Sequence, residues 1–275
     1  MIILEIRDAS QIIPDKSDRI LGYLFYYEKH KRFYTELLRD VDEWDAPFMF
    51  KPFVEKKIFS VDHIWSKKWV ELRIIPRERQ NIADILRDNQ LKGYDEYRLL
   101  MLSEGRCAQD DCYVRRVSED AIPVEITDRL SSKLLDVMPL SENRAIVFFK
   151  NGSSKKVSFN ELAGDNHLFN RILSEKDIFF CMKVSPGGNG IEWDEDRFFS
   201  AEQLYRSGEG SDINYNDLLY FVKYRIMDTG DVTDELRVSR QYIHQLVSSG
   251  VLTPLKEGVK ERSFQRALIE SEQRI

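Results

Sequence analysis

The stretch from Val238 to Leu255 constrains the fold of this chain more than any other part, because it contains signals for both ends of one helix. Ser239 is a favourable N-cap, and Gly250 suits the position just beyond a helix C-terminus. Apolar residues recur between them at helical spacing and define one face: Ile243, Leu246 and Val247. The sequence therefore predicts a short helix with a single apolar face.

The opposite face of that helix is polar and contains no acidic residue. It consists of Arg240, Gln241, His244, Gln245 and Ser248. Long hydrogen-bonding side chains with a fixed positive charge suit the major groove of DNA, where Arg and Gln hydrogen-bond to the edges of purines. This helix is therefore a candidate for contact with bases in double-stranded DNA.

The residues on either side of the helix suggest a complete module. Upstream, Asp228 and Asp231 have the spacing of a capping box at the start of an earlier helix. Downstream, a Glu-Gly turn at 257–258 separates two short segments that suit a hairpin, or wing. The side chains expected to contact phosphate are Ser239, Lys256, Lys260 and Arg262.

The order of these parts resembles the winged helix-turn-helix of the MerR and excisionase families, over residues ~227–270. The resemblance depends on a helix, a turn, the sequence V-S-R, a second helix, the pattern S-G-x-L-x-P and a basic hairpin. It implies a DNA-binding protein such as a transcriptional regulator or an antitoxin-like component. Gly230 falls inside the first helix, where glycine costs roughly 1 kcal/mol relative to alanine.

The charge of the chain limits how it could bind DNA. A net charge of −6 argues against a protein that coats nucleic acid with its whole surface. Between residues 239 and 266 the basic residues outnumber Glu257 and Glu261; they are Arg240, Lys256, Lys260, Arg262 and Arg266. Binding would depend on this patch, assisted by a homo-oligomer or a protein partner, and its salt dependence would be shallow.

A second hypothesis assigns the same region to protein contacts. In this alternative the helix-turn-helix is degenerate, and the chain is a non-enzymatic interaction scaffold. It predicts a protein partner that co-purifies and no affinity for any duplex at low salt.

Residues 124–206 form a second unit with a clear strand pattern. Asn151-Gly152 is typical of the two-residue turn that closes a hairpin. A short helix is expected near 201–205. Two hairpins are expected: 145–149 with 156–159, and 179–184 with 190–193.

Much of this unit, ~140–206, resembles a small bacterial α+β family known as a domain of unknown function, number 2442. The resemblance depends on a strand, an N-G turn, a second strand, an F-x-x-L motif, and an I-x-W-D motif before a terminal L-Y. It implies a bacterial or phage-borne cytoplasmic protein and assigns no activity.

The sequence of residues 1–123 predicts a first α+β unit of unknown role. Within it, residues 19–38 are rich in Tyr and Phe on both sides of the charged segment 28–32, which predicts two strands joined by a hairpin. A single amphipathic helix is the alternative. Residues 61–75 predict a helix that Pro76 stops. The expected apolar face of that helix is Ile64, Trp65, Trp69, Leu72 and Ile75.

Two sets of residues raise the alternative of an enzyme. Cys107 is a candidate nucleophile with His63, and Asp194–Asp196 belongs to an acidic cluster that could act as acid and base or hold Mg²⁺. A structural zinc site usually needs four Cys or His ligands, whereas Cys107 and Cys112 lie among scattered histidines. We therefore expect no metal, no cofactor and no enzyme, and we favour a solvated turn for the acidic cluster.

The predicted fold class is α+β and multidomain, with two small α+β units followed by a C-terminal winged helix-turn-helix. The predicted domains are residues 1–123, 124–206 and 214–275, with a linker at 207–214 that is rich in Gly and Ser. A helix over 214–226 would brace the last domain or mediate self-association. Its expected apolar face is Leu219, Val222 and Ile226.

The sequence also bears on the compartment of the protein. No apolar run reaches the ~18 residues of a membrane helix, and the N-terminus has no signal-peptide pattern. The three cysteines are an odd number and too few for a disulfide scaffold, so they suit a reducing environment. We expect a cytoplasmic protein with no membrane partner.

Overall fold

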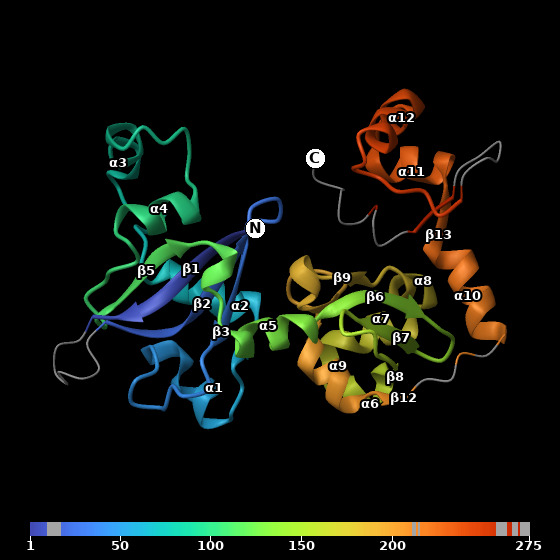
Figure 1. Cartoon of the computed structure of the whole chain (residues 1–275), viewed down its shortest axis with the longest axis horizontal. Helices are drawn as coiled ribbons and strands as arrows, with labels where there is room; N and C mark the ends of the chain where they lie inside the picture. Colours follow the sequence, from blue (N-terminus) through green and yellow to red (C-terminus); the bar gives the residue numbers. More distant parts are fainter. Residues whose placement is uncertain (10–17, 211–212, 214, 257–262, 266–268, 270–275) are drawn as a thin grey trace. The chain divides into compact units, whose positions relative to one another are not determined.

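The computed structural model describes residues 1–9, 18–210, 213, 215–256, 263–265 and 269. In these residues the chain is α+β, with antiparallel sheets and short helices (Figure 1), so the α+β part of the predicted fold class is confirmed. The chain divides into two compact units, Met1–Asp128 and Arg129–Ile275. The finer division of the second unit at 206 and 214 stays a prediction.

The first unit is built on an antiparallel sheet with the strand order β4-β3-β2-β1-β5. Its strands are β1 (Ile2–Asp8), β2 (Arg19–Tyr27), β3 (Arg32–Leu37), β4 (Ser60–Val61) and β5 (Cys112–Val117). The two strands expected from 19–38 are confirmed, and the helical alternative is wrong. Lys31 adopts the left-handed conformation in the turn between β2 and β3, with φ 52°.

Short helices pack on one face of this sheet. The helices that the structure describes here are α1 (Lys51–Glu55), α2 (His63–Glu71), α3 (Ile82–Asp88) and α4 (Glu96–Leu102), and α5 (Val124–Ser131) follows at the boundary of the unit. The core between sheet and helices contains Leu4, Leu24, Phe33, Trp69 and Leu100, all with at most 1% of their surface exposed.

The expected apolar face of α2 is partly wrong. Trp69 is buried, but Trp65 and Leu72 are exposed, and the helix ends at Glu71 rather than near Pro76. The buried stripe runs through Ser66, whose hydroxyl lies 2.9 Å from that of Thr35 on β3. A small hydrogen-bonding residue allows the helix to approach the strand closely, and this rotates Trp65 towards solvent.

The second unit contains a four-stranded antiparallel sheet with the order β12-β8-β7-β6 and a three-stranded sheet with the order β11-β10-β9. The strands are β6 (Leu134–Pro139), β7 (Arg144–Phe149), β8 (Ser154–Ser158), β9 (Lys183–Val184), β10 (Gly190–Glu192), β11 (Phe198–Ser200) and β12 (Glu209–Gly210). The N-G hairpin is confirmed, with Gly152 at φ 83°. Residues 207–214 were expected to be a linker, but Glu209 and Gly210 form the strand β12, which pairs with β8.

An aromatic core fills the space between these strands and the helices α6 (Phe159–Ala163), α7 (Asn170–Ser174), α8 (Lys176–Phe180) and α9 (Ala201–Ser207). The ring of Phe159 makes edge contacts with Phe179, Trp193 and Phe199, with centroids 5.4–5.6 Å apart. Phe179 belongs to α8, so the expectation of a strand over 179–184 is wrong except at β9.

The last described elements of the second unit are α10 (Tyr215–Arg225), β13 (Ile226–Asp228), α11 (Thr229–Leu236), α12 (Arg240–Ser248) and β14 (Ser263–Gln265). β13 pairs with β14, and a separate core gathers Met227, Val232, Ile243, Leu246, Leu252 and Ile269. This small core is the one that positions α12.

The helix α10 joins this small core to the four-stranded sheet. Its residues Tyr220 and Phe221 pack on Met138, Leu140 and Ile146. The predicted apolar face is wrong for Leu219 and Val222, which are exposed.

No helix in the described part of the chain is both long enough and apolar enough to cross a membrane.

Candidate nucleic-acid interface

The helix α11 begins at the capping box expected from the sequence. Asp228 Oδ1 accepts a hydrogen bond from the backbone N–H of Asp231 at 2.8 Å, and Asp231 Oδ2 accepts one from the N–H of Asp228 at 3.0 Å. The helix ends at Leu236, and the next residue, Arg237, adopts the left-handed conformation with φ 55°. The chain thus turns sharply within three residues before α12 begins.

The ends of α12 also follow the sequence prediction. Ser239 Oγ accepts a hydrogen bond from the N–H of Tyr242 at 3.2 Å. At the other end Gly250 has φ 76°, and its N–H donates to the carbonyl of Val247 at 3.1 Å. The N–H of Val251 donates to the carbonyl of Leu246 at 2.9 Å. This pair of bonds is a Schellman motif, which satisfies the last carbonyl groups of the helix.

The two faces of α12 are divided as the sequence predicts. Ile243 and Leu246 are buried in the small core, with 1% and 7% of their surface exposed. The polar residues are all exposed: Arg240, Gln241, His244, Gln245 and Ser248. The apolar face holds α12 on the small core, so the polar residues lie on the side of the helix that faces away from that core.

The polar residues of α12 are not equivalent. The hydroxyl of Ser248 donates to the carbonyl of His244 at 2.8 Å, and that of Ser239 caps the helix. Both hydroxyls already stabilise the helix itself. The long side chains that extend from this face are Arg240, Gln241, His244 and Gln245.

Arg240 extends towards the start of the preceding helix. Its Nη2 atom lies 3.9 Å from the position that a Cβ on Gly230 would occupy, and the same Cβ would lie 3.0 Å from Asp228 Oδ1. Gly230 therefore leaves room for the carboxylate that caps α11. This crowding gives a reason for glycine at a position where it weakens the helix.

The wing is only partly within the described residues. Lys256 is exposed, whereas Lys260 and Arg262 lie outside the described residues. The strand β14 pairs with β13, in the register Met227↔Phe264. The sequence did not predict this pairing, because it joins segments on opposite sides of both helices.

The candidates for enzyme chemistry have other contacts. Cys107 Sγ lies 3.1 Å from Nη1 of Arg73, and the Arg73 guanidinium stacks on Trp69 at 4.0 Å. Burial and the nearby Asp110 carboxylate raise the pKa of Cys112 above its ordinary range. His63 is buried beside the ring of Tyr34. Among the described residues, no three His, Cys, Asp or Glu side chains are placed to hold a metal ion.

The acidic cluster forms a turn. Asp194 Oδ1 accepts hydrogen bonds from the backbone N–H groups of Asp196 and Arg197 at 3.2 and 2.9 Å, and Asp194 forms an ion pair with the Arg197 side chain. The hydrogen bond from the Arg197 side chain, and after it the backbone hydrogen bonds, lower the pKa of Asp194. The carboxylate closes its own loop, which agrees with the solvated turn that the sequence favours.

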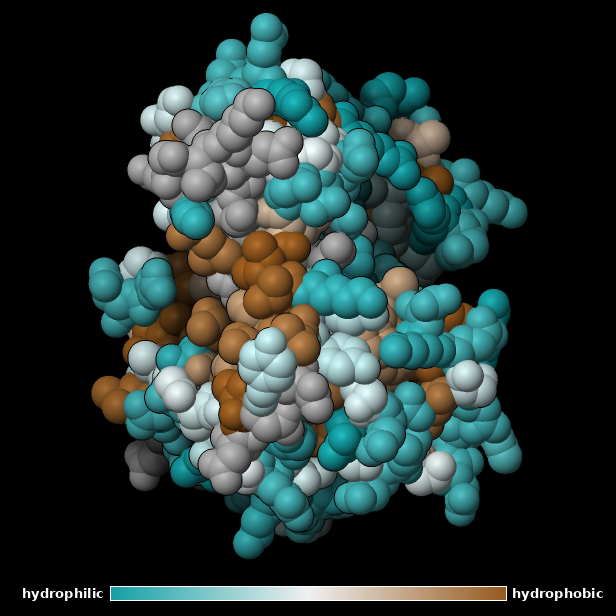
Figure 2. Space-filling view, turned by 90° about the vertical axis from the view of Figure 1, so that its right-hand side faces the viewer, coloured by the Kyte–Doolittle hydropathy of each residue, from teal (hydrophilic) through white to brown (hydrophobic). Residues whose placement is uncertain are grey.

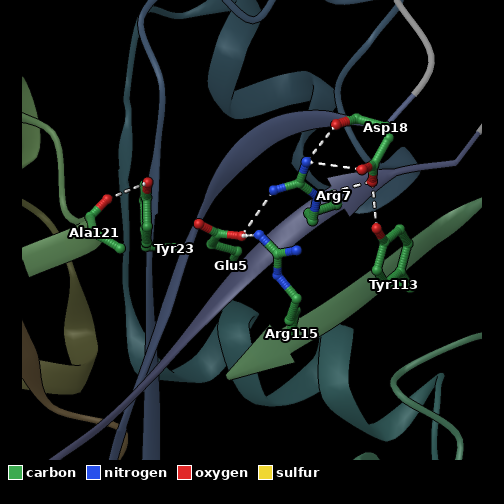
Figure 3. Close-up of polar contacts among 7 residues, drawn as sticks. All are labelled: Glu5, Arg7, Asp18, Tyr23, Tyr113, Arg115 and Ala121. Atoms are coloured by element: carbon green, nitrogen blue, oxygen red, sulfur yellow. Dashed lines mark hydrogen bonds and ion pairs between the residues drawn. The ribbon is translucent and has the colours of Figure 1, made fainter. Parts of the chain in front are cut away.

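A charged network in the first unit was not predicted from the sequence (Figure 3). The buried Glu5 Oε2 accepts from Arg7 Nη1 at 2.8 Å and from Arg115 Nη2 at 2.9 Å. Arg7 also pairs with Asp18 through Nε at 2.9 Å, and Tyr113 donates to the same carboxylate. The available signal was Glu5 and Arg7 within an otherwise apolar strand. Their partners come from strand register, Glu5↔Arg115 and Arg7↔Tyr113.

This network predicts a loss of stability in acid. The hydrogen bonds from Arg7 and then Tyr113 lower the pKa of Asp18 from 3.8 to about 2. A lowered pKa stabilises the folded state above the unfolded pKa, and this contribution disappears as the pH falls from about 4 to about 2. The effect is small, because the Asp18 side chain is 55% exposed.

Urea titrations of the wild type and Asp18→Asn between these pH values measure this contribution. The wild type is expected to be more stable near pH 4, and the difference is expected to shrink towards pH 2. A difference that stays constant across this range would contradict the assignment.

Comparison of the chain with protein-family models, curated proteins and solved structures found no match. The two resemblances drawn from sequence motifs therefore stay predictions.

Proposed function

We propose that the C-terminal part of this chain binds double-stranded DNA, with α12 in the major groove, and that the protein acts as a transcriptional regulator or antitoxin-like component. The observation that supports this most directly is the polar face of α12. Arg240, Gln241 and His244 are exposed on a helix whose opposite side is fixed in the small core. Side chains of these types on a rigid helix have the reach that base contacts require.

The same geometry indicates which residues would contact bases and which would contact phosphates. Arg240 and Gln241 lie in the first turn of α12, the part of a recognition helix that contacts base edges most often. Lys256 is exposed beyond the helix and would contact the phosphate backbone. Only five basic residues lie between residues 239 and 266 of the sequence, so we expect a shallow dependence of affinity on salt.

Selection from a pool of random duplexes, followed by fluorescence polarisation at about 50 mM salt, tests this proposal. The wild type is expected to enrich a specific duplex. The double variant Arg240→Ala/Gln241→Ala is expected to bind that duplex at least about 30-fold more weakly, because two bidentate base contacts at about 1–3 kcal/mol each are lost.

The matched control is Arg171→Ala. Arg171 is an exposed arginine on α7 that pairs with Glu175 at 3.0 Å, so this variant removes the same charge from a site outside α12. It is expected to bind like the wild type. Failure to enrich any duplex, or equal affinity of the double variant and the control, would contradict the proposal.

A further inference from the structure

The helix α10 carries a strip of exposed hydrophobic side chains. Tyr215, Leu218, Leu219 and Val222 are 72%, 50%, 48% and 55% exposed. Figure 2 shows hydrophobic side chains gathered across this side of the molecule. Among the described helices, α10 exposes more large hydrophobic residues than any other. Large contiguous apolar surfaces on a folded protein commonly mark interaction sites.

The opposite side of α10 fixes this orientation. Asp217 forms an ion pair with Lys156 at 3.0 Å, and the buried Arg225 pairs with Asp136 on β6. Between these two ion pairs, Tyr220 and Phe221 pack on the sheet. Turning the apolar strip inward would break both ion pairs and expose two aromatic rings. The strip therefore faces outward as a permanent feature of the fold.

The spacing of the strip indicates what covers it. Its residues are separated by three, one and three positions, so they form a continuous line along one side of a helix. A line of this kind packs best against a second helix with the same spacing, because the ridges of each helix fit the grooves of the other. A second copy of α10 supplies that surface.

We propose that α10 is the interface of a two-fold symmetric homodimer in which the two copies of the helix pack antiparallel. In this arrangement Val222 of one copy faces Tyr215 of the other, and Leu218 faces Leu219. The exposed Lys223, whose Nζ lies 5.0 Å from the ring centroid of Tyr224 in its own chain, then also lies beside Tyr215 of the second copy, where an ammonium group and an aromatic face attract each other. The helix dipoles also run in opposite directions, so each N-terminus lies near a C-terminus.

The area of the strip sets the strength of this dimer. A patch of this kind covers on the order of 300–600 Å², whereas a stable specific interface buries about 800 Å² on each partner. The dimer is therefore weak without DNA, with a Kd on the order of tens of micromolar. If the proposed function holds, two modules on one inverted-repeat site add to this contact, and the dimer forms on DNA.

Sedimentation equilibrium of the full chain without DNA, from about 1 to about 300 µM, tests the dimer directly. The wild type is expected to show a reversible monomer–dimer equilibrium. Leu219→Glu and Leu219→Lys are each expected to weaken it at least 10-fold, because each places two like charges near the two-fold axis. An equimolar mixture of the two variants is expected to recover the dimer, because opposite charges then meet.

The matched control is Leu168→Glu, which introduces the same charge at a leucine that is 60% exposed outside α10. It is expected to dimerise like the wild type. A wild type that stays monomeric at every concentration overturns the proposal, and so does an equal loss of dimer in the control. A wild-type dimer that Leu219→Glu leaves intact also overturns it, because the interface then lies elsewhere.

Two variants distinguish failure of the proposed dimer from failure of the proposed DNA binding. The Arg240→Ala/Gln241→Ala variant is expected to retain the dimer and lose DNA binding. Leu219→Glu is expected to retain the affinity of the wild type for a single half-site and to lose the additional affinity for two half-sites.

Discussion

Replacing Asp136 with alanine is expected to lower the free energy of unfolding of the second unit by about 3–5 kcal/mol. Asp136 and Arg225 form an ion pair whose side chains are only 4% and 2% exposed. Asp136 Oδ1 also accepts a hydrogen bond from the backbone N–H of Val137 at 2.7 Å. Removing the carboxylate leaves the guanidinium buried without this counter-charge, and water has little access to replace it.

The stability of the second unit is measured by native-state hydrogen exchange of peptides from β6, β7 and α10. Protection in these segments is expected to fall to a similar extent, because the ion pair joins α10 to the sheet. The double variant Asp136→Leu/Arg225→Met is expected to recover most of the loss, since apolar residues of similar size often replace a buried ion pair without penalty. A double variant as unstable as Asp136→Ala would contradict this account.

Gly188→Ala is the second substitution with a large expected effect. Gly188 has φ 79°, and a Cβ at this position would lie 2.1 Å from the carbonyl oxygen of Leu134 on β6. Alanine therefore has both an unfavourable backbone conformation and a collision with a strand. We expect a loss of about 3 kcal/mol or more in the free energy of unfolding, measured by urea denaturation.

Gly152→Ala separates these two causes. Gly152 has φ 83°, but a Cβ there would meet no atom within 4 Å. Its substitution is expected to cost only the conformational part, about 1–2 kcal/mol. Equal losses in the two variants would show that the contact with Leu134 is relaxed without penalty.

The parts of the fold that were predicted correctly are those whose signals lie within a few residues of each other. The capping box of Asp228 and Asp231 and the two ends of α12 at Ser239 and Gly250 depend on one turn of chain each. The same is true of the N-G hairpin around Gly152. Local hydrogen bonds determine these structures, so a single sequence contains the information for them.

The errors concern side chains whose partners are distant in the sequence. The orientation of α10 was predicted from its aliphatic residues, but the buried ion pairs of Asp217 and Arg225 decide it. The strand β6 was not predicted, since Asp136 and Pro139 are unusual in a central segment of a sheet. Its position at the edge of the β12-β8-β7-β6 sheet accommodates both residues.

The candidate DNA-contact residues illustrate the same limit. The position of Arg240, Gln241, His244, Gln245 and Ser248 on one exposed face of α12 follows from helical periodicity, and the structure has this arrangement. The approach of Arg240 to the position of Gly230 and the pairing of β13 with β14 required the folded chain. The network of Glu5, Arg7 and Arg115 likewise depends on strand register rather than on any local pattern.

The pairing of β13 with β14 has a consequence for the synthesis of the protein. The strand that completes the small core, together with Ile269, is made after both helices of the module. During translation α12 therefore lacks part of its support until the segment beyond residue 263 has left the ribosome. In a chain that ends before residue 263, α12 lacks these contacts, so prematurely ended products are expected to have a less stable α12 than the full chain.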